Sequence, residues 1–324
     1  MVFFLLNISL GSVNIPFPEV LKGLTGGTVA KDSWAAIIVD YRLPKAIIAM
    51  ITGSGLAVSG LLMQTLFKNP LAGPFVLGIS SGASLGVALF ILGGSLLGIS
   101  AGLMIGKWGL VLAACIGSFL VLLVVLIVAN KVRDTMTLLI IGLMVGSLTA
   151  AFVSILAYFS KAEELQRYIF WSFGSLGDQS WTGVWILIGC YLLGILIAFM
   201  MIKPLNALLL GDQYAQSLGI NLKRSRVGII IATSILAGAI TAFTGPIAFV
   251  GLAAPHLVRQ LMPASNHKIL FPAVILGGAI LMLICDTIAQ VPSSELTLPI
   301  NAITALFGAP VVIWLLVRKK KLVF

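Results

Sequence analysis

Long apolar stretches follow one another along the chain, separated by short links that are polar or rich in glycine and proline. A helix needs about 20 apolar residues to cross a bilayer, whose hydrocarbon core is about 30 Å thick. Met1–Leu10 is apolar but would rise only about 15 Å, so we expect the first helix to begin upstream of Met1, with nine full spans as the alternative. Nine longer stretches are candidate spans: Pro44–Met63, Leu77–Leu97, Trp108–Ala129, Thr137–Phe159, Gly183–Ile202, Val227–Phe243, Ile247–Met262, Phe271–Val291 and Leu298–Val317.

The composition is that of a membrane protein. Of the 324 residues, 60% are hydrophobic and 9% are charged, and the mean hydropathy is +1.14. An average soluble domain carries about 25% charged residues, so this chain has too few polar side chains to cover a water-facing surface. A soluble enzyme, a nucleic-acid-binding protein and a disordered chain are therefore excluded. The sequence predicts an all-α, polytopic transmembrane bundle of about ten helices, folded as one domain over residues 1–324 and surrounded by the lipid bilayer.

The positions of Lys and Arg predict the orientation of the bundle. If the loop after Met63 is cytoplasmic and the sides alternate from there, 13 of the 20 Lys and Arg residues lie on the inner side and 7 on the outer side. Cytoplasmic loops of membrane proteins carry such an excess. We therefore expect a multi-pass protein of the cell (inner) membrane with a cytoplasmic C-terminus at Arg318–Lys321. The net charge of +10 then reflects topology and not nucleic-acid binding.

Glycines recur at helical spacing, as at Gly78, Gly82 and Gly86, and again at Gly142 and Gly146. In lipid there is no hydrophobic drive between helices, so small residues on one face serve to bring two backbones close together. We interpret these glycines as packing positions.

Two links are predicted to be more than simple turns. Asn69–Pro74 has a turn-forming composition that interrupts the helical pattern. Within Ser160–Phe173, Ser160 and Glu163 have the spacing of a capping box, which predicts a short helix on the outer surface. Anchoring at the membrane interface by the aromatic residues of this segment is an equally good interpretation.

The longest inner loop, Lys203–Arg226, predicts another short helix. Asp212 is placed to cap a helix over Gln213–Leu218, and Gly219 stands where a C′ glycine belongs. An apolar face on such a helix needs a cover, and the composition leaves open whether another protein or the rest of this chain provides it. Three side chains would share that face: Tyr214, Ala215 and Leu218.

Side chains suited to catalysis or metal binding are sparse. The chain has no P-loop and no complete dinucleotide-binding fingerprint. A metal site needs three or four ligands, so with two histidines in the chain we interpret His256 as hydrogen-bonded and predict no metal site and no cofactor. Asp286 lies inside a span near its outer end, which favours structural hydrogen bonding over a role in transport. The odd number of cysteines within apolar runs argues against disulfides: Cys115, Cys190 and Cys285.

Several motifs occur in order along nearly the whole chain: Arg42-Leu43-Pro44-Lys45, Gly60–Gln64 (GLLMQ), Asn69–Pro74 (NPLAGP), Leu77–Ala83 (LGISSGA), Gly245–Leu252 (GPIAFVGL), Pro255–Arg259 (PHLVR), Leu298-Pro299-Ile300 and Gly308-Ala309-Pro310. This set resembles the FecCD family, the permease subunits of ABC importers for iron–siderophore complexes, haem and vitamin B12.

The resemblance implies ten transmembrane helices per subunit, a dimer of permeases, two cytoplasmic ABC ATPase subunits and an extracytoplasmic substrate-binding protein. We expect the second permease to be another copy of this chain. ATP hydrolysis would belong to the ATPase subunits, so this chain is not expected to be an enzyme. The resemblance also implies a coupling segment that docks on the ATPase, formed by Gly211, Asp212, Gln213, Tyr214, Ala215, Gln216, Ser217, Leu218 and Gly219.

The same resemblance implies roles at the outer surface and along the path. Arg42 and Lys45 match basic positions that meet acidic groups of the binding protein. Thr135 matches a position near the cytoplasmic gate. The spans Thr137–Phe159 and Leu298–Val317 resemble those that line the path, where we expect Gly146, Ser147 and Thr304 to contribute. Three positions depart from the family pattern: Lys45 and Gln290 stand where arginines occur, and Thr297 stands where an acidic residue is common.

The leading hypothesis is a permease that moves a bulky metal chelate inward by alternating access, driven by ATP hydrolysis on separate subunits. A secondary transporter driven by an ion gradient is the alternative, although such carriers usually need several titratable groups inside the membrane. An integral-membrane enzyme is disfavoured because catalytic groups do not cluster in the sequence.

Overall fold

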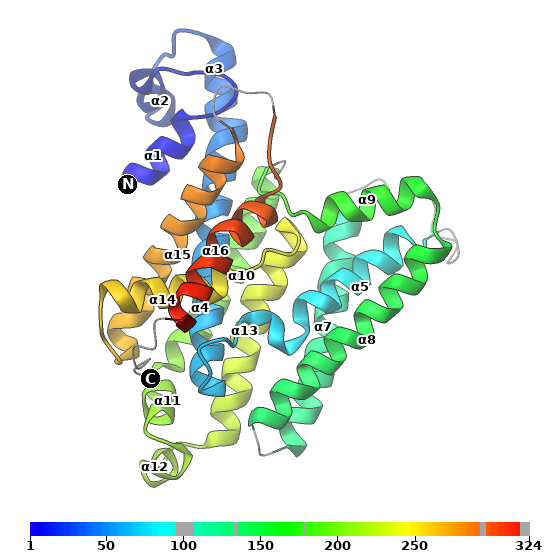
Figure 1. Ribbon diagram of the computed structural model, residues 1–324. Coiled ribbons are helices and arrows are strands. Elements are labelled where there is room, and N and C mark those ends of the chain that lie inside the picture. Colours follow the sequence, from blue (N-terminus) through cyan, green and yellow to red (C-terminus); the bar gives the residue numbers. More distant parts are fainter. Residues whose placement is uncertain (95–106, 133–134, 178, 292–295, 318–324) are drawn as a thin grey trace.

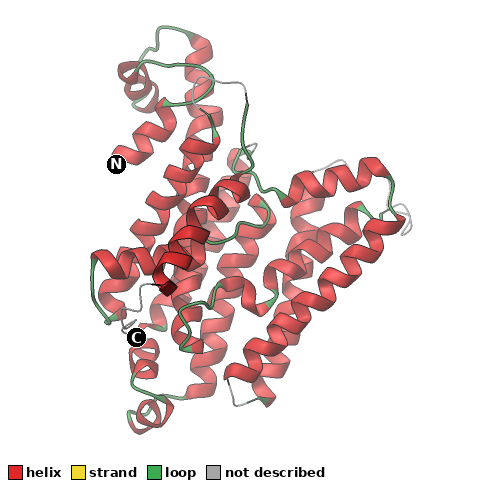
Figure 2. Cartoon of the chain, viewed as in Figure 1, coloured by secondary structure: helices red, strands yellow, loops and turns green. Residues whose placement is uncertain are grey.

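The computed structural model describes all residues except 95–106, 133–134, 178, 292–295 and 318–324, and this part of the chain consists of helices joined by loops and turns (Figures 1 and 2). In that part of the chain there is no strand, and six helices are long and apolar enough to cross a membrane. The predicted all-α, polytopic architecture is therefore confirmed. The basic residues 318–321 and the last residues of one predicted span, 95–97, lie outside the described residues.

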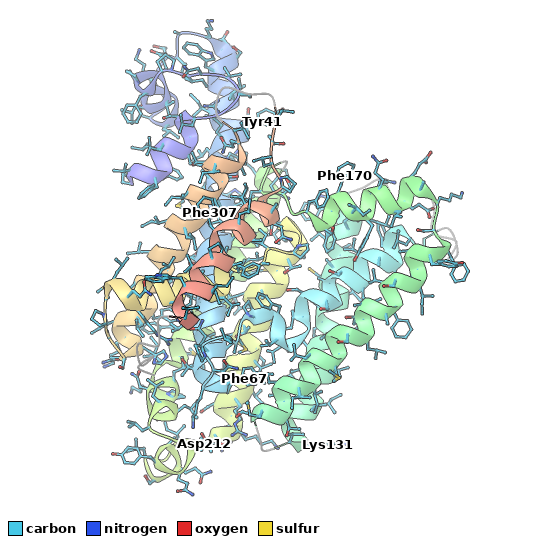
Figure 3. The ribbon with its side chains drawn as sticks, in the orientation of Figure 1. Tyr41, Phe67, Lys131, Phe170, Asp212 and Phe307 are labelled. Atoms are coloured by element: carbon cyan, nitrogen blue, oxygen red, sulfur yellow. The ribbon has the colours of Figure 1, made fainter. Side chains whose placement is uncertain are left out.

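A group of short helices occupies one end of the molecule: α1 (Val2–Ser9), α2 (Phe17–Leu24) and α3 (Asp32–Ala36). A π-helical turn, η1 (Ile37–Arg42), joins α3 to α4 (Leu43–Phe67). Pro44 has no N–H to donate, and it follows this π-helical turn at a point where the backbone is already helical. The group lies at the opposite end from α12 (Asp212–Ser217) (Figure 1), and Tyr41 and Asp212 mark the two ends in Figure 3. We call these the outer end and the inner end, following the predicted orientation.

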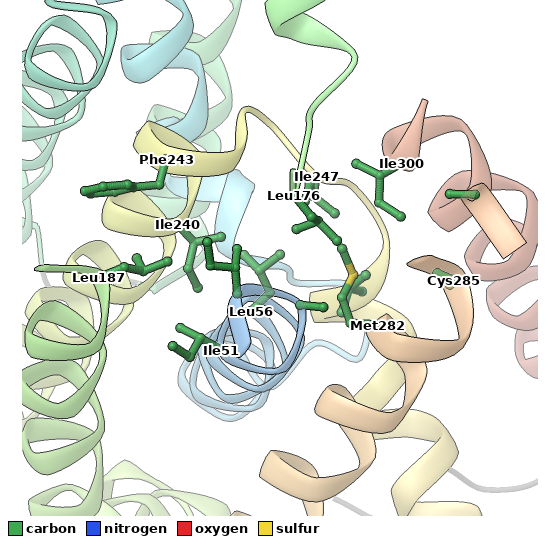
Figure 4. Close-up of a cluster of buried hydrophobic side chains, with 14 of the residues drawn as sticks. Ile51, Leu56, Leu176, Leu187, Ile240, Phe243, Ile247, Met282, Cys285 and Ile300 are labelled. Carbon is green, nitrogen blue, oxygen red and sulfur yellow. The ribbon is translucent and has the colours of Figure 1, made fainter. Parts of the chain in front are cut away.

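Helix α4 is the centre of the bundle. Its spanning window is 89% buried inside the protein, and it is surrounded by α13 (Leu222–Thr244), α14 (Val250–Leu261) and α15 (His267–Ala289). Ile51 and Leu56 of α4 and Met282 of α15 belong to the hydrophobic cluster of Figure 4. Because α4 is enclosed on all sides, its sequence is apolar around the whole helix and lacks a polar face.

The outlying helices are far less enclosed. The spanning windows of α7 (Lys107–Lys131), α8 (Thr135–Phe159) and α10 (Trp181–Met200) are only 28%, 17% and 28% buried. The turn η2 (Pro74–Leu77) leads into α5 (Ile79–Ile91), which packs against α7 and α8, and α9 (Ala162–Ser172) lies across the outer end of this group (Figure 1). Exposed apolar surface of this extent suits lipid or another subunit.

The segment predicted as a spanning helix over Ile247–Met262 contains a shorter helix. α14 has 12 residues, which rise about 18 Å and are too few to cross the hydrocarbon core as a helix. The reason lies in Gly245 and Pro246: Gly245 ends α13 with a φ of 73°, and the chain is non-helical up to Phe249. The segment still connects the outer end of α13 to the inner end of α15.

The outer helix α9 is confirmed, but its predicted capping box is displaced by one residue. The backbone N–H of Lys161 donates to Glu164 Oε2 at 3.3 Å, so the box joins these two residues. Ser160 does not serve as the cap of α9, because its Oγ instead donates to the carbonyl of Ala157 in the last turn of α8 at 2.9 Å.

The recurrent glycines Gly82, Gly86 and Gly142 bring helices together, as predicted, whereas an added Cβ at Gly146 would meet only Ser81 Oγ, at 3.4 Å. A Cβ atom added at Gly86 would lie 2.1 Å from the carbonyl oxygen of Ala113 in α7, and one at Gly142 would lie 2.1 Å from that of Val76. Such distances leave no room for a side chain, so these positions require glycine. The predicted link Asn69–Pro74 is also confirmed as an interruption of the helical pattern, non-helical over residues 69–73 and followed at Pro74 by η2.

The tightest glycine contact among the described residues gives a stability prediction. A Cβ atom at Gly60 of α4 would lie 1.6 Å from the carbonyl oxygen of Gly251 in α14. We expect Gly60→Ala to force the two helices apart and to lower the free energy of unfolding by about 1–3 kcal/mol, measured by denaturant titration in detergent micelles. Gly189→Ala is the control, because nothing lies within 4 Å of the added methyl. Equal stability of the two variants would contradict the packing argument.

Candidate coupling segment, outer cavity and membrane-level path

Two short helices form the predicted inner loop. α11 (Ile202–Leu209) and α12 are separated by Gly211, whose φ of 107° is rarely adopted by other residues. At the end of α12 the N–H of Ile220 donates to the carbonyl of Ala215 at 3.0 Å, and that of Gly219 donates to Gln216 at 2.9 Å. These are the two bonds of a Schellman motif, so the prediction of Gly219 as a C′ glycine is confirmed.

Asp212 does not cap α12, contrary to the prediction, because its carboxylate is engaged elsewhere. One oxygen lies 3.0 Å from Lys68 Nζ at the end of α4, and the other lies 2.9 Å from Arg226 Nη2 in α13. Half-exposed ion pairs of this kind contribute only about 0–1 kcal/mol each. The main effect of Asp212 is therefore to fix the position of α12 relative to α4 and α13.

An apolar row is exposed on this fixed segment. Leu210, Tyr214 and Leu218 are spaced four residues apart and are 64%, 53% and 56% exposed. The predicted face is wrong for Ala215, which is fully buried and holds α12 against the bundle. We call Leu210, Tyr214 and Leu218 the coupling face. A shallow hollow beside it is lined by Leu210, Gly211, Asp212, Gln213, Tyr214 and Ser217.

A buried polar node lies next to α11 at the inner end. His267 is fully buried, and its Nδ1 lies 2.8 Å from Asn206 Oδ1 of α11, while its Nε2 lies 2.9 Å from Thr65 Oγ1 of α4. An amide oxygen only accepts, so Nδ1 carries the proton and Nε2 is an acceptor, which shares the single Thr65 hydroxyl proton with the carbonyl of Leu61 at 2.9 Å. The node thus joins α4, α11 and α15.

The interpretation of His256 as a hydrogen-bonded residue is confirmed. Its Nε2 donates to the carbonyl of Pro70 at 2.7 Å, which ties α14 to the link after α4. Nearby, Gln64 Nε2 donates to the carbonyl of Leu252, and Gln64 Oε1 accepts from Arg259, both at 3.3 Å. The inner ends of α4 and α14 are therefore fastened by polar contacts.

At the outer end, Asp286 has the structural role that its position predicts. It is 2% exposed, and its Oδ1 lies 3.0 Å from Lys45 Nζ. Its Oδ2 accepts from Asn7 Nδ2 at 2.9 Å and from Gln290 Nε2 at 2.8 Å. Three donors satisfy the buried carboxylate, which joins α1, α4 and α15.

Arg42, the other predicted docking residue, also has partners within the chain. Its Nη1 donates to the carbonyls of Ile8 and Ser9 at 2.8 and 2.9 Å, and its Nη2 donates to Val13. These contacts include carbonyl groups at the end of α1, which have no partner within that helix. Docking by Arg42 and Lys45 stays a prediction. A docking partner would compete with the contacts that these two side chains make within the chain.

A cavity of about 520 Å³ opens beside the Asp286 cluster. Lys45 and Asp286 line it together with Phe170 and Phe173 from the α9 region, and with Thr297 and Ile300 near the start of α16 (Ile300–Val317). We call it the outer cavity. Its lining is both charged and aromatic.

Within one chain, the four predicted path residues fall into two groups. Thr135, Gly146 and Ser147 lie on α8, where Ser147 is exposed and Gly146 approaches Ser81 of α5. Thr304 lies on α16, is 2% exposed and donates to the carbonyl of Asn301 at 3.1 Å. It borders an apolar cavity of about 190 Å³ between α14, α15 and α16. The roles of these four residues in a path stay predictions.

Sequence reasoning missed Asn7 and Asn206, which connect α1 and α11 to the bundle. Each is a polar residue within an otherwise apolar segment, and that isolation is the signal that could have identified it. Asp286 is 279 residues from Asn7 and His267 is 61 residues from Asn206, so no local pattern predicts either pair.

Taken together, six long apolar helices among the described residues, exposed apolar side chains at the inner end and a charged outer cavity define a polytopic membrane protein. The family model of the FecCD transport family matches residues 1–318. The chain belongs to that family.

Relatives and solved structures agree with this assignment. The chain is 33% identical over 322 residues to the hemin transport system permease protein HmuU of Yersinia pestis, covering 99% of this chain and 95% of HmuU. It is 38% identical over 284 residues to the vitamin B12 import system permease protein BtuC of Klebsiella pneumoniae, covering 87% and 83%. A metal-chelate type ABC transporter solved in an inward-facing conformation matches with a TM-score of 0.84 and 30% identity, over 98% of this chain and 96% of that one. PsaBC from Streptococcus pneumoniae, with a TM-score of 0.55 and 15% identity, shares the fold.

Proposed function

We propose that this chain is the membrane permease subunit of an ATP-driven importer for a bulky metal chelate. The observation that carries the proposal is the coupling face, an apolar row exposed on an inner segment that Asp212 holds in place. Hemin and vitamin B12 in the names of two relatives, and the metal chelate of the similar structure, support the substrate class. An iron–siderophore complex, haem and a cobalamin all belong to that class.

The working unit is a dimer of two copies of this chain, seated on two cytoplasmic ATPase subunits. In support, α8 carries a row of large apolar side chains that are each more than half exposed: Ile140, Met144, Leu148 and Phe152. Such a row suits contact with another subunit or lipid. The same helix carries Thr135, Gly146 and Ser147, so a second copy would bring two sets of path residues together around one axis.

The outer cavity receives the extracytoplasmic binding protein and its cargo. Lys45 lines this cavity, and acidic groups on the binding protein would compete with Asp286 for its ammonium group. Exposed charge pairs contribute mainly to encounter and orientation. Closure of the ATPase subunits moves the two coupling faces and switches the path between outward and inward access. The run of α16 from the outer cavity toward the inner end supports a cytoplasmic C-terminus (Figure 1).

Reconstitution in vesicles tests the proposal. The complex of this chain with its ATPase subunits is inserted into proteoliposomes, and uptake of radiolabelled haem, cobalamin and a ferric siderophore is measured with and without ATP. We expect uptake of one of these chelates only when ATP and the ATPase are both present. Uptake without nucleotide, or uptake that follows a proton or sodium gradient, would favour a secondary transporter instead.

A further inference from the structure

Helices α4 and α15 are joined at three levels along their length. In the middle of the bundle their backbones touch: a Cβ atom at Gly53 would lie 2.2 Å from the carbonyl oxygen of Gly278, and one at Gly278 would lie 2.4 Å from that of Gly53. Neither position has room for a side chain, so the two helices cannot slide past each other without a clash.

The other two levels are polar and lie at opposite ends. At the inner end, Thr65 of α4 meets His267 of α15 at 2.9 Å, and both side chains are fully buried. At the outer end, Lys45 of α4 meets Asp286 of α15 at 3.0 Å. A relative displacement of the two helices would break a buried hydrogen bond at one end and an ion pair at the other, and buried groups left without partners are strongly unfavourable.

Each end of this pair also contacts a functional region. The inner end reaches the loop Lys203–Arg226 twice, through His267 to Asn206 of α11, which precedes the coupling segment, and through Lys68 to Asp212 of the coupling segment itself. At the outer end, Lys45 and Asp286 themselves line the outer cavity. The same two helices therefore contact the region where an ATPase would dock and the region where a binding protein would dock.

We infer that α4 and α15 act as one rigid rod, which carries displacements of the coupling segment to the outer cavity, and that Thr65 and His267 are the positioning residues that lock its inner end. The inference rests on the proposed function, since it assigns the element that links the two docking sites. Linkage of this kind is reciprocal, so occupancy of the outer cavity also biases the coupling segment.

The test measures how nucleotide changes access to the outer cavity. Thr297, an exposed residue of the cavity wall, is replaced by cysteine in a chain whose Cys115, Cys190 and Cys285 are changed to alanine. The complex with its ATPase subunits is labelled with a membrane-impermeant maleimide, with and without a slowly hydrolysed ATP analogue. We expect the labelling rate to differ with and without nucleotide, and we express the difference as the ratio of the faster to the slower rate. Thr65→Val should reduce that ratio by roughly 2- to 30-fold.

Matched variants distinguish the loss of the Thr65–His267 hydrogen bond from a general loss of stability. Thr52→Val makes the same change on α4 at a fully buried threonine whose hydroxyl has no partner among the described residues, so its ratio should equal the parent value. Thr65→Ser keeps the hydroxyl and should preserve the ratio, and Thr65→Ala replaces the valine variant if that one fails to assemble. A ratio of one in the parent, or a parental ratio in the variants that lack the Thr65 hydroxyl, would overturn the inference. ATP-dependent uptake by the parent, measured separately, reports on the proposed function alone.

Discussion

Asp286→Ala is expected to lower the free energy of unfolding by about 3 kcal/mol, the lower end of the range for breaking a buried ion pair. The substitution leaves Lys45 without its carboxylate and removes the Asp286 acceptor of the Gln290 amide, while Asn7 Nδ2 keeps Thr287 Oγ1 as an acceptor at 3.0 Å. The lower end applies because the Lys45 side chain is 23% exposed and can regain some water. Denaturant titration in detergent micelles, followed by tryptophan fluorescence, measures the effect.

A double variant shows whether the unpaired charge is the cause. Lys45→Met combined with Asp286→Leu removes both charges, and replacing a buried pair by apolar residues is often neutral. We expect this variant to recover most of the lost stability. Glu163→Ala removes an exposed carboxylate from α9 and should leave the unfolding curve unchanged. A double variant as unstable as Asp286→Ala would indicate lost packing and not an uncompensated charge.

Leu218→Asp is expected to abolish transport while the protein folds and inserts normally. The side chain is more than half exposed, so the bundle gains little stability from it. In a complex it would be part of an apolar contact, where the loss of one anchor residue costs about 2 kcal/mol or more, a factor of roughly 30 in affinity. Co-purification with the ATPase subunits and nucleotide-dependent uptake measure the two effects.

The matched control places the same charge at the other end of the molecule. Tyr158 is 82% exposed near the outer end of α8, so Tyr158→Asp makes a comparable change far from the coupling face. It should keep the parent's affinity for the ATPase. If Leu218→Asp still bound the ATPase normally and supported uptake, the coupling face would lie elsewhere on the chain.

The features that local sequence determines were predictable. The apolar spacing predicts the spans, and Gly219 predicts the end of α12 because a Schellman turn needs a residue that tolerates a positive φ. The glycine spacing at Gly82 and Gly86 predicts close helix packing for the same kind of reason, since only backbone and Cβ geometry are involved.

The features that tertiary partners determine were not predictable. Asp212 has the position of an N-cap, but Lys68 and Arg226 draw its carboxylate away from the helix end. Ala215 was expected on the exposed face, and its burial depends on how α12 sits against the bundle. The sequence predicts Arg42 and Lys45 as outer basic residues that meet a binding protein. It does not predict their partners within the chain, which are carbonyl groups of α1 for Arg42 and Asp286 for Lys45.

The sidedness of the coupling segment tests the central claim most directly. Gln216 is exposed on α12, and Glu163 is exposed on α9 at the outer end, so a single cysteine is placed at one or the other in a chain without its native cysteines. Intact cells are treated with a membrane-impermeant maleimide. We expect Glu163→Cys to react in intact cells and Gln216→Cys to react only after the membrane is opened. Labelling of Gln216→Cys in sealed cells would place α12 outside, away from any cytoplasmic ATPase, and would contradict the account.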